Sequence, residues 1–149
     1  MATALKTLAA VFCIGLFTRS IGDSVAAQEQ RWLKAGANAA GDVYVASGTI
    51  VRTGADVKAW LLYNYRAAQS DTWIRAPYQS MRVVAYFKCR ERQIGALQHK
   101  YFAAPGAGGE EVQLVGIPIH AAAPTYFDVE PGSLNELALE TLCLRSAAK

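Results

Sequence analysis

Residues 80–92, SMRVVAYFKCRER, alternate in a way that predicts a β-strand ending on a cysteine. Successive side chains of a strand point to opposite faces of the sheet. Because Cys89 is in phase with the apolar side chains of this run, we expect it to face the core. The apolar face holds Met81, Val83, Ala85, Phe87 and Cys89, and the opposite face holds Arg82, Val84, Tyr86, Lys88 and Arg90.

The end of the chain changes to a helical period. Pro131 and Gly132 interrupt the preceding segment, and Ser133 is followed three residues later by Glu136. This spacing is typical of a capping box, in which the serine hydroxyl accepts a backbone N–H and the glutamate reaches back to the cap. A helix beginning near Leu134 gathers an apolar side that faces the core, made of Ala138, Leu139, Leu142 and Cys143.

The N-terminal residues have the pattern of an export signal. Lys6 precedes an apolar run at residues 8–17, and small residues at 25–27 form a cleavage site. The apolar run is too short to span a bilayer, which takes about 20 residues. We therefore interpret residues 1–27 as a cleaved signal peptide and residues 28–149 as a single domain.

Export and the cysteine count together favour a disulfide. Cys13 lies inside the apolar run after Phe12, where a lipid-attachment motif requires a small residue, so the chain is not expected to be a lipoprotein. We therefore expect the protein to be secreted or periplasmic, with the cell surface as a further option. The chain that remains after cleavage carries Cys89 and Cys143. An even number of cysteines in an oxidising compartment favours pairing. Closing a loop of about 55 residues stabilises a chain by about 4 kcal/mol.

The segments between these features predict strands separated by turns. Residues 81–89 and 93–102 are joined by a short charged turn, which indicates an antiparallel hairpin. Small or polar residues predict loops at 34–41, 66–77 and 104–111. Strands followed by one terminal helix indicate an α+β fold, namely a single antiparallel sheet of about six strands with the helix tethered by the disulfide to one face. The remaining extended segments are 42–46, 49–52, 57–65, 112–117 and 126–130.

Basic side chains form the best candidate for a ligand site. Removing residues 1–27 takes away two basic residues and one acidic residue, so the net charge falls from +3 to +2. This charge is too small to indicate nucleic-acid binding. A local basic ridge can still attract acidic proteins, heparin-like glycans or anionic lipid. The alternative is a solvated face that guards against edge pairing. The ridge consists of Lys58, Arg82, Lys88, Arg90 and Arg92.

Other chemistry finds little support in the sequence. His99 and His120 lie 21 positions apart without further metal ligands at suitable spacing, so no metal site is predicted. The glycines at 106–109 lack the Lys-Ser/Thr ending of a phosphate loop, and no cofactor is expected. Pairing with Cys143 removes Cys89 as a nucleophile. Four aromatic residues could line a sugar-binding surface, although packing is their commoner use; these are Trp60, Tyr63, Tyr65 and Trp73.

Features spread over residues 32–143 resemble, in their order and spacing, the bacterial surface-adhesin protein E domain family. They are Trp32, Val43-Tyr44-Val45, Ile50 with Arg52 and Gly54, residues 57–65, Tyr78-Gln79-Ser80, residues 86–92, Tyr101, and residues 131–133 through Leu142-Cys143. The resemblance implies an exported single sheet with a disulfide-tethered C-terminal helix. It also implies adhesion to host matrix and plasma proteins, such as vitronectin, laminin and plasminogen for the pathogen member. The chain differs from that lipoprotein in lacking an anchor cysteine at Gln28.

These observations predict a non-catalytic binding module with a protein or acidic-glycan partner. One alternative is a structural envelope protein that associates with a second copy of itself as a homodimer. Another is a small cell-wall hydrolase, which would need a pair of carboxylates in a cleft. The carboxylates available for that role all fall in expected turns or loops: Asp42, Asp56, Asp71, Glu91, Glu110, Glu111 and Asp128.

Overall fold

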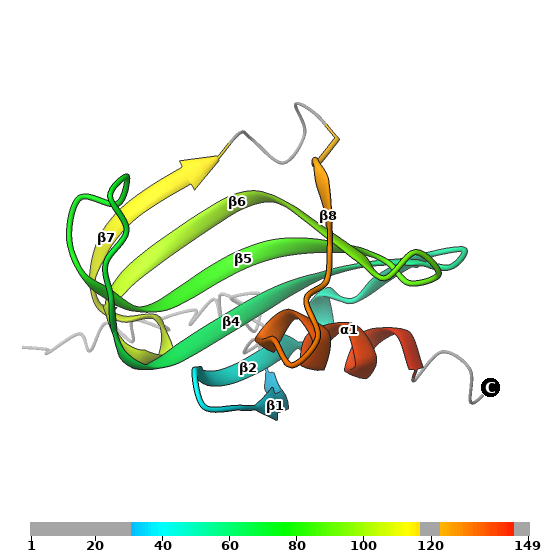
Figure 1. The fold of residues 1–149 in the computed structure, drawn as a ribbon, viewed down its shortest axis with the longest axis horizontal. Helices are drawn as coiled ribbons and strands as arrows, with labels where there is room; N and C mark the ends of the chain where they lie inside the picture. Colours follow the sequence, from blue (N-terminus) through cyan, green and yellow to red (C-terminus); the bar gives the residue numbers. More distant parts are fainter. Residues whose placement is uncertain (1–30, 117–122, 145–149) are drawn as a thin grey trace, which may run out of the picture.

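The computed structural model describes residues 31–116 and 123–144. The predicted signal peptide 1–27, with Cys13, lies outside the described residues, as do Gln28 and His120. Figure 1 shows a twisted sheet with one helix packed against part of it.

Within the described ranges the sheet has eight strands, and each strand pair is antiparallel. Six strands form the path β1-β2-β4-β5-β6-β7, while β3 pairs with β4 and β8 with β6. Short 3-10 turns follow β2 and β6, and the helix α1 comes last. The bounds are β1 (Trp32–Ala37), β2 (Gly41–Ala46), β3 (Val51–Thr53), β4 (Asp56–Gln69), β5 (Tyr78–Lys88), β6 (Gln93–Ala104), β7 (Gly108–Gly116), β8 (Tyr126–Asp128) and α1 (Leu134–Leu144).

The main core lies between α1 and one face of the sheet. The helix crosses β1, β2 and β4 and leaves β6 and β7 uncovered (Figure 1). The predicted inner face of residues 81–89 is confirmed, because its odd-numbered side chains join this core, as do the odd-numbered side chains of residues 57–65. The core residues least exposed to water include Val43, Leu61, Ala85, Phe87, Ala138 and Leu142.

The predicted disulfide between Cys89 and Cys143 is confirmed. Its sulfur atoms are 1.99 Å apart and its Cα atoms 5.6 Å apart. Cys89 directly follows β5 and Cys143 lies in the last turn of α1. Both side chains pack against the main core. The bond therefore fixes the C-terminal end of the helix to the hairpin end of the sheet.

The N-terminus of α1 is held by a variant of the predicted capping box. The Glu136 N–H donates to Ser133 Oγ at 3.2 Å, as expected. The Glu136 carboxylate accepts from the Gly132 N–H at 2.7 Å, one residue earlier than the cap itself. The same carboxylate forms an ion pair with Arg92 from the β5–β6 turn. The helix is thus tied to the sheet at both ends.

Three sequence expectations about loops were wrong. Strand β1 occupies the first half of the expected loop 34–41, β4 continues to Gln69 inside the expected loop 66–77, and β7 begins at Gly108 inside the expected loop 104–111. Strands β1 and β7 contain small residues at these positions, and such residues give no alternating apolar pattern. Gly36 has a specific reason, because a Cβ there would lie 2.8 Å from Leu137 Cβ. Glycine at this position lets α1 pack closely on β1.

Candidate functional site

The face of the sheet turned away from α1 gathers positive charge over aromatic rings. The side chains of β4 and β5 that alternate with the core residues point to this side. We call it the cation–aromatic face and define it by Trp32, Lys58, Trp60, Arg82, Tyr86, Lys88 and Tyr126.

Each cation of this face lies over at least one ring. The Arg82 guanidinium carbon is 5.5 Å from the ring centroids of both Trp32 and Trp60. Lys58 Nζ is 5.3 Å from the Tyr86 centroid. Attraction between a cation and the negative face of a ring contributes about 0.5–1 kcal/mol at exposed sites. The rings therefore restrict where these long side chains can point.

Cross-strand register builds the far end of this face. Lys58 pairs with Tyr86, Tyr86 with Gly95, and Gly95 with Tyr126, so one row crosses four strands. A Cβ on Gly95 would lie 2.9 Å from Pro124 Cβ. The missing side chain thus gives the segment before β8 room to approach, and Tyr126 can join the row.

Lys88 completes that end. It lies two residues beyond Tyr86 on the same face of β5, and its Nζ is 4.3 Å from the Tyr126 centroid. A cavity of about 220 Å³ opens beside Lys58, Tyr86 and Tyr126 and includes one carboxylate, Asp56. Burial, and then the charge of Asp56, raises the pKa of Tyr126, so its phenol is neutral near pH 7.

The structure separates the predicted basic ridge into three parts. Lys58, Arg82 and Lys88 share the cation–aromatic face. Arg90 is exposed in the turn that follows β5. Arg92 instead pairs with Glu136 at the start of α1.

Other lysines of the sheet are neutralised, whereas two on this face are not. Lys34 Nζ lies 2.7 Å from Asp42, and Lys100 Nζ lies 3.0 Å from Glu111. Among the residues that the structure describes, Lys58 and Lys88 form no salt bridge. Their charge is therefore available to an approaching acidic group.

Comparison with protein families identifies the chain. A family model described as surface-adhesin protein E matches residues 32–144. The chain belongs to this family. Membership of the surface-adhesin protein E family supports an adhesin-like protein that is exported or exposed at the cell surface.

Solved structures of protein E from Haemophilus influenzae are similar to this family member. One shares 11% identity, covers 69% of this chain and 77% of that chain, and has a TM-score of 0.46. A second crystal form covers 70% of this chain and 82% of that chain at 11% identity, with a TM-score of 0.49. The match to protein E from non-typeable Haemophilus influenzae covers 78% of this chain and 77% of that chain. Its sequence identity is 11% and its TM-score is 0.49. No curated protein matches the chain.

The helix side of the sheet carries a second group of aromatic rings beyond α1. Tyr78 and Tyr101 meet edge to face with centroids 4.7 Å apart. Tyr65 packs against Tyr78 at 5.7 Å, and Trp73 against Tyr101 at 6.2 Å. Burial is the main cause that raises the pKa values of Tyr65 and Tyr101 to about 12. The three tyrosine rings form a packed cluster with Ile74 and Val112.

The four aromatic residues considered for a sugar surface therefore divide between the two faces. Trp60 belongs to the cation–aromatic face. Tyr63 and Tyr65 stack with centroids 6.5 Å apart on the helix side, where Trp73 also lies against the tyrosine cluster. Sequence reasoning missed Trp32 and Tyr126 as partners of the cations, because their positions depend on strand register.

Several carboxylates considered for a hydrolase have structural partners instead. Asp42 and Glu111 pair with lysines, and Asp71 accepts the Tyr78 hydroxyl at 2.6 Å. Asp128 accepts the Gln93 amide at 3.0 Å. In the described part of the chain, no three His, Cys, Asp or Glu side chains form a metal-binding group. None of the helices in the described ranges has the length and apolar character of a membrane span.

Proposed function

We propose that the chain is an exported, non-catalytic binding module that holds an acidic partner protein against its cation–aromatic face. One observation carries the proposal: Lys58, Arg82 and Lys88 each lie over an aromatic ring on the same side of one sheet. Family membership supports an adhesin-like function, and an adhesin needs a surface that binds a partner.

The rings make the cations effective for binding. Ordering a flexible side chain at an interface costs about 0.5–1.5 kcal/mol. Side chains already held over rings avoid part of that cost. Clustered positive charge also raises the rate at which acidic partners arrive. Tyr and Trp are, moreover, enriched among the residues that dominate binding energy at interfaces.

The two turn arginines complete the proposed site. Arg90 is exposed next to Lys88 and extends the positive charge beyond the sheet. Arg92 shares its charge with Glu136, so we expect a smaller contribution from it. The proposed ligand-binding residues are thus Lys58, Arg82, Lys88, Arg90 and Arg92.

Charge reversal on the face tests this function. The exported, oxidised protein is passed over immobilised vitronectin and laminin, with immobilised heparin as a separate acidic-glycan surface. The variant is Lys58→Glu with Lys88→Glu. The matched control is Arg66→Glu with Arg75→Glu, which changes the net charge equally at two exposed positions that are outside the cation–ring pairs.

We expect the Lys58/Lys88 variant to bind a matrix protein at least about tenfold more weakly, a loss of about 1.4 kcal/mol. The control should bind like the unchanged protein. Equal weakening in both variants would show that net charge alone matters. Binding to heparin without binding to either protein would contradict a protein partner.

A further inference from the structure

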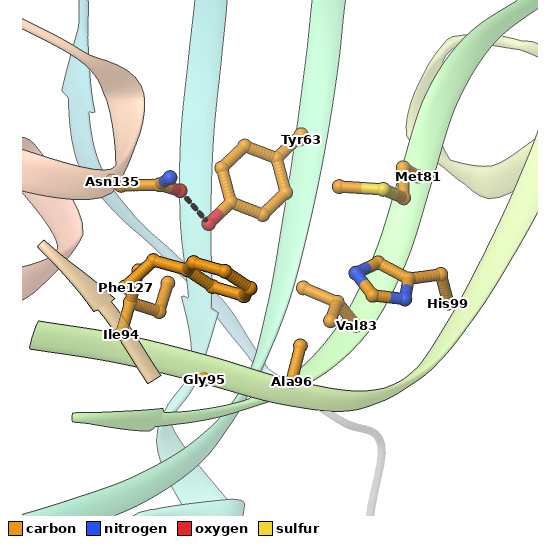
Figure 2. Close-up of a pocket in the computed structure, with 9 residues that line it drawn as sticks. All are labelled: Tyr63, Met81, Val83, Ile94, Gly95, Ala96, His99, Phe127 and Asn135. Atoms are coloured by element: carbon orange, nitrogen blue, oxygen red, sulfur yellow. Dashed lines mark hydrogen bonds between the residues drawn. The ribbon is translucent and has the colours of Figure 1, made fainter. Parts of the chain in front are cut away.

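A separate pocket lies on the helix side of the sheet, between three elements. The sheet supplies its base, the first turn of α1 one wall and β8 another (Figures 1 and 2). Its volume is about 240 Å³. Because it faces away from the cation–aromatic face, an inference about it does not rest on the proposed function.

Small residues form part of the base of the pocket. Gly95 and Ala96 of β6 form part of the base beside Val83. Figure 2 shows Met81 and His99 on one side of the space and Phe127 and Asn135 on the other. These side chains face one another across the space.

The polar groups of the pocket are few and uncharged. The Tyr63 hydroxyl donates to Asn135 Oδ1 at 2.7 Å (Figure 2). That bond leaves the Asn135 amide N–H groups as donors for another partner. Burial lowers the pKa of His99, so near pH 7 the imidazole is mainly neutral, with one donor and one acceptor nitrogen. Among the described residues that line the pocket, none is a Lys, Arg, Asp or Glu.

The rim exposes an apolar side chain that a ligand would cover. Phe127 is 66% exposed, although it lines a pocket with mainly apolar walls. Removing apolar surface from water contributes about 25 cal/mol per Å². Enclosure by several elements, apolar walls and a few fixed polar groups are the usual features of small-molecule sites.

We infer that this pocket binds a small, uncharged aromatic molecule with one hydrogen-bonding group. A dry cavity of about 150 Å³ is sufficient to hold benzene. The larger volume here has room for a second fused ring. The Asn135 amide and the His99 imidazole offer partners to the polar atom of such a molecule.

Indole serves as the probe, because it is uncharged, bicyclic and carries one N–H. The chain has two methionines, Met1 and Met81. Labelling with [methyl-13C]methionine therefore gives one NMR signal from the pocket wall. The exported, oxidised protein is titrated with indole, and in parallel with indole-5-carboxylate, which has the same rings and a negative charge.

We expect indole to shift the Met81 methyl signal saturably, with a Kd below about 1 mM. The carboxylate should bind at least about tenfold more weakly, since burying a charge without a partner is unfavourable. Ala96→Leu fills the base of the pocket and should weaken indole binding at least about tenfold. Ala103→Leu, the same change at an exposed site of β6, should leave binding unchanged.

If Ala96→Leu disturbs folding, Phe127→Ala provides a second test of the pocket. Phe127 is largely exposed, so we expect this variant to fold. This variant should weaken indole binding about threefold or more through lost ring contact. An unshifted Met81 signal would overturn the inference. Unchanged indole binding in a folded Ala96→Leu protein would also overturn it. If Ala96→Leu does not fold, unchanged indole binding in Phe127→Ala would overturn it.

Discussion

The two faces of the sheet use alternate residues of the same strands for different purposes. On the helix side, Phe87 is 1% exposed and packs with α1 into the main core. One residue later on β5, Lys88 turns to the other face and lies over Tyr126. The helix side therefore excludes water to stabilise the fold, while the other face, in which Val84 is also buried, presents ordered charge to water. We expect changes on the first face to lower stability and changes on the second to lower binding.

Removing the disulfide is the strongest way to test the stabilising role of the helix side. The Cys89→Ser, Cys143→Ser variant loses a cross-link between residues 54 positions apart. We expect its free energy of unfolding to fall by about 4 kcal/mol, because the unfolded chain regains the entropy of that loop. Urea denaturation followed by circular dichroism measures the change. A loss below about 1 kcal/mol would show that the helix is held by packing alone.

Two leucines on α1 sharpen the comparison between buried and exposed positions. Leu142 is 1% exposed and Leu144 is 67% exposed. Leu142→Ala should lower the free energy of unfolding by about 3 kcal/mol through lost burial and a cavity. Leu144→Ala is the matched control and should change it by no more than about 0.5 kcal/mol. Similar losses of stability in both variants would contradict the assignment of Leu142 to the core and of Leu144 to the surface.

Alkaline pH should destabilise the helix side through its tyrosines. Burial raises the pKa values of Tyr65 and Tyr101 from 10.0 to about 12. Between these pH values the unfolded chain releases phenolic protons that the folded chain retains, so stability falls as pH rises. Urea midpoints measured from pH 9 to 12 check this. Tyr65→Phe should reduce the slope, and an equal slope in both proteins would contradict the assignment.

The helix, the central strands and the disulfide could be predicted because their signals are local. Residues 81–89 alternate clearly, Ser133 and Glu136 mark a helix start, and both cysteines are in phase with apolar residues. Strand β1 gave no such signal, since its Gly and Ala residues become a strand by pairing with β2. The need for glycine at position 36 is evident only from the fold, which brings Leu137 of α1 against it.

The candidate site could be predicted only in part, for a related reason. The sequence indicated that Arg82 and Lys88 share a face, because both lie on one alternating strand. The rings beneath them come from elsewhere, since Trp32 lies on β1 and Tyr126 on β8. Arg92 was grouped with them by spacing, whereas its partner Glu136 approaches through the fold of the helix. Register and helix docking are long-range properties that spacing does not contain.

The most direct test of the division between the faces measures binding and stability on one variant. Binding of the Lys58→Glu, Lys88→Glu protein to the immobilised matrix protein is followed from about 0.05 to 0.5 M salt, a range over which screening of surface charge becomes strong. We predict that the unchanged protein binds more weakly as salt rises. The variant should bind weakly at every salt concentration, with its free energy of unfolding within about 1 kcal/mol of the original. Unchanged binding by the variant, or a stability loss as large as that of Leu142→Ala, would contradict the account.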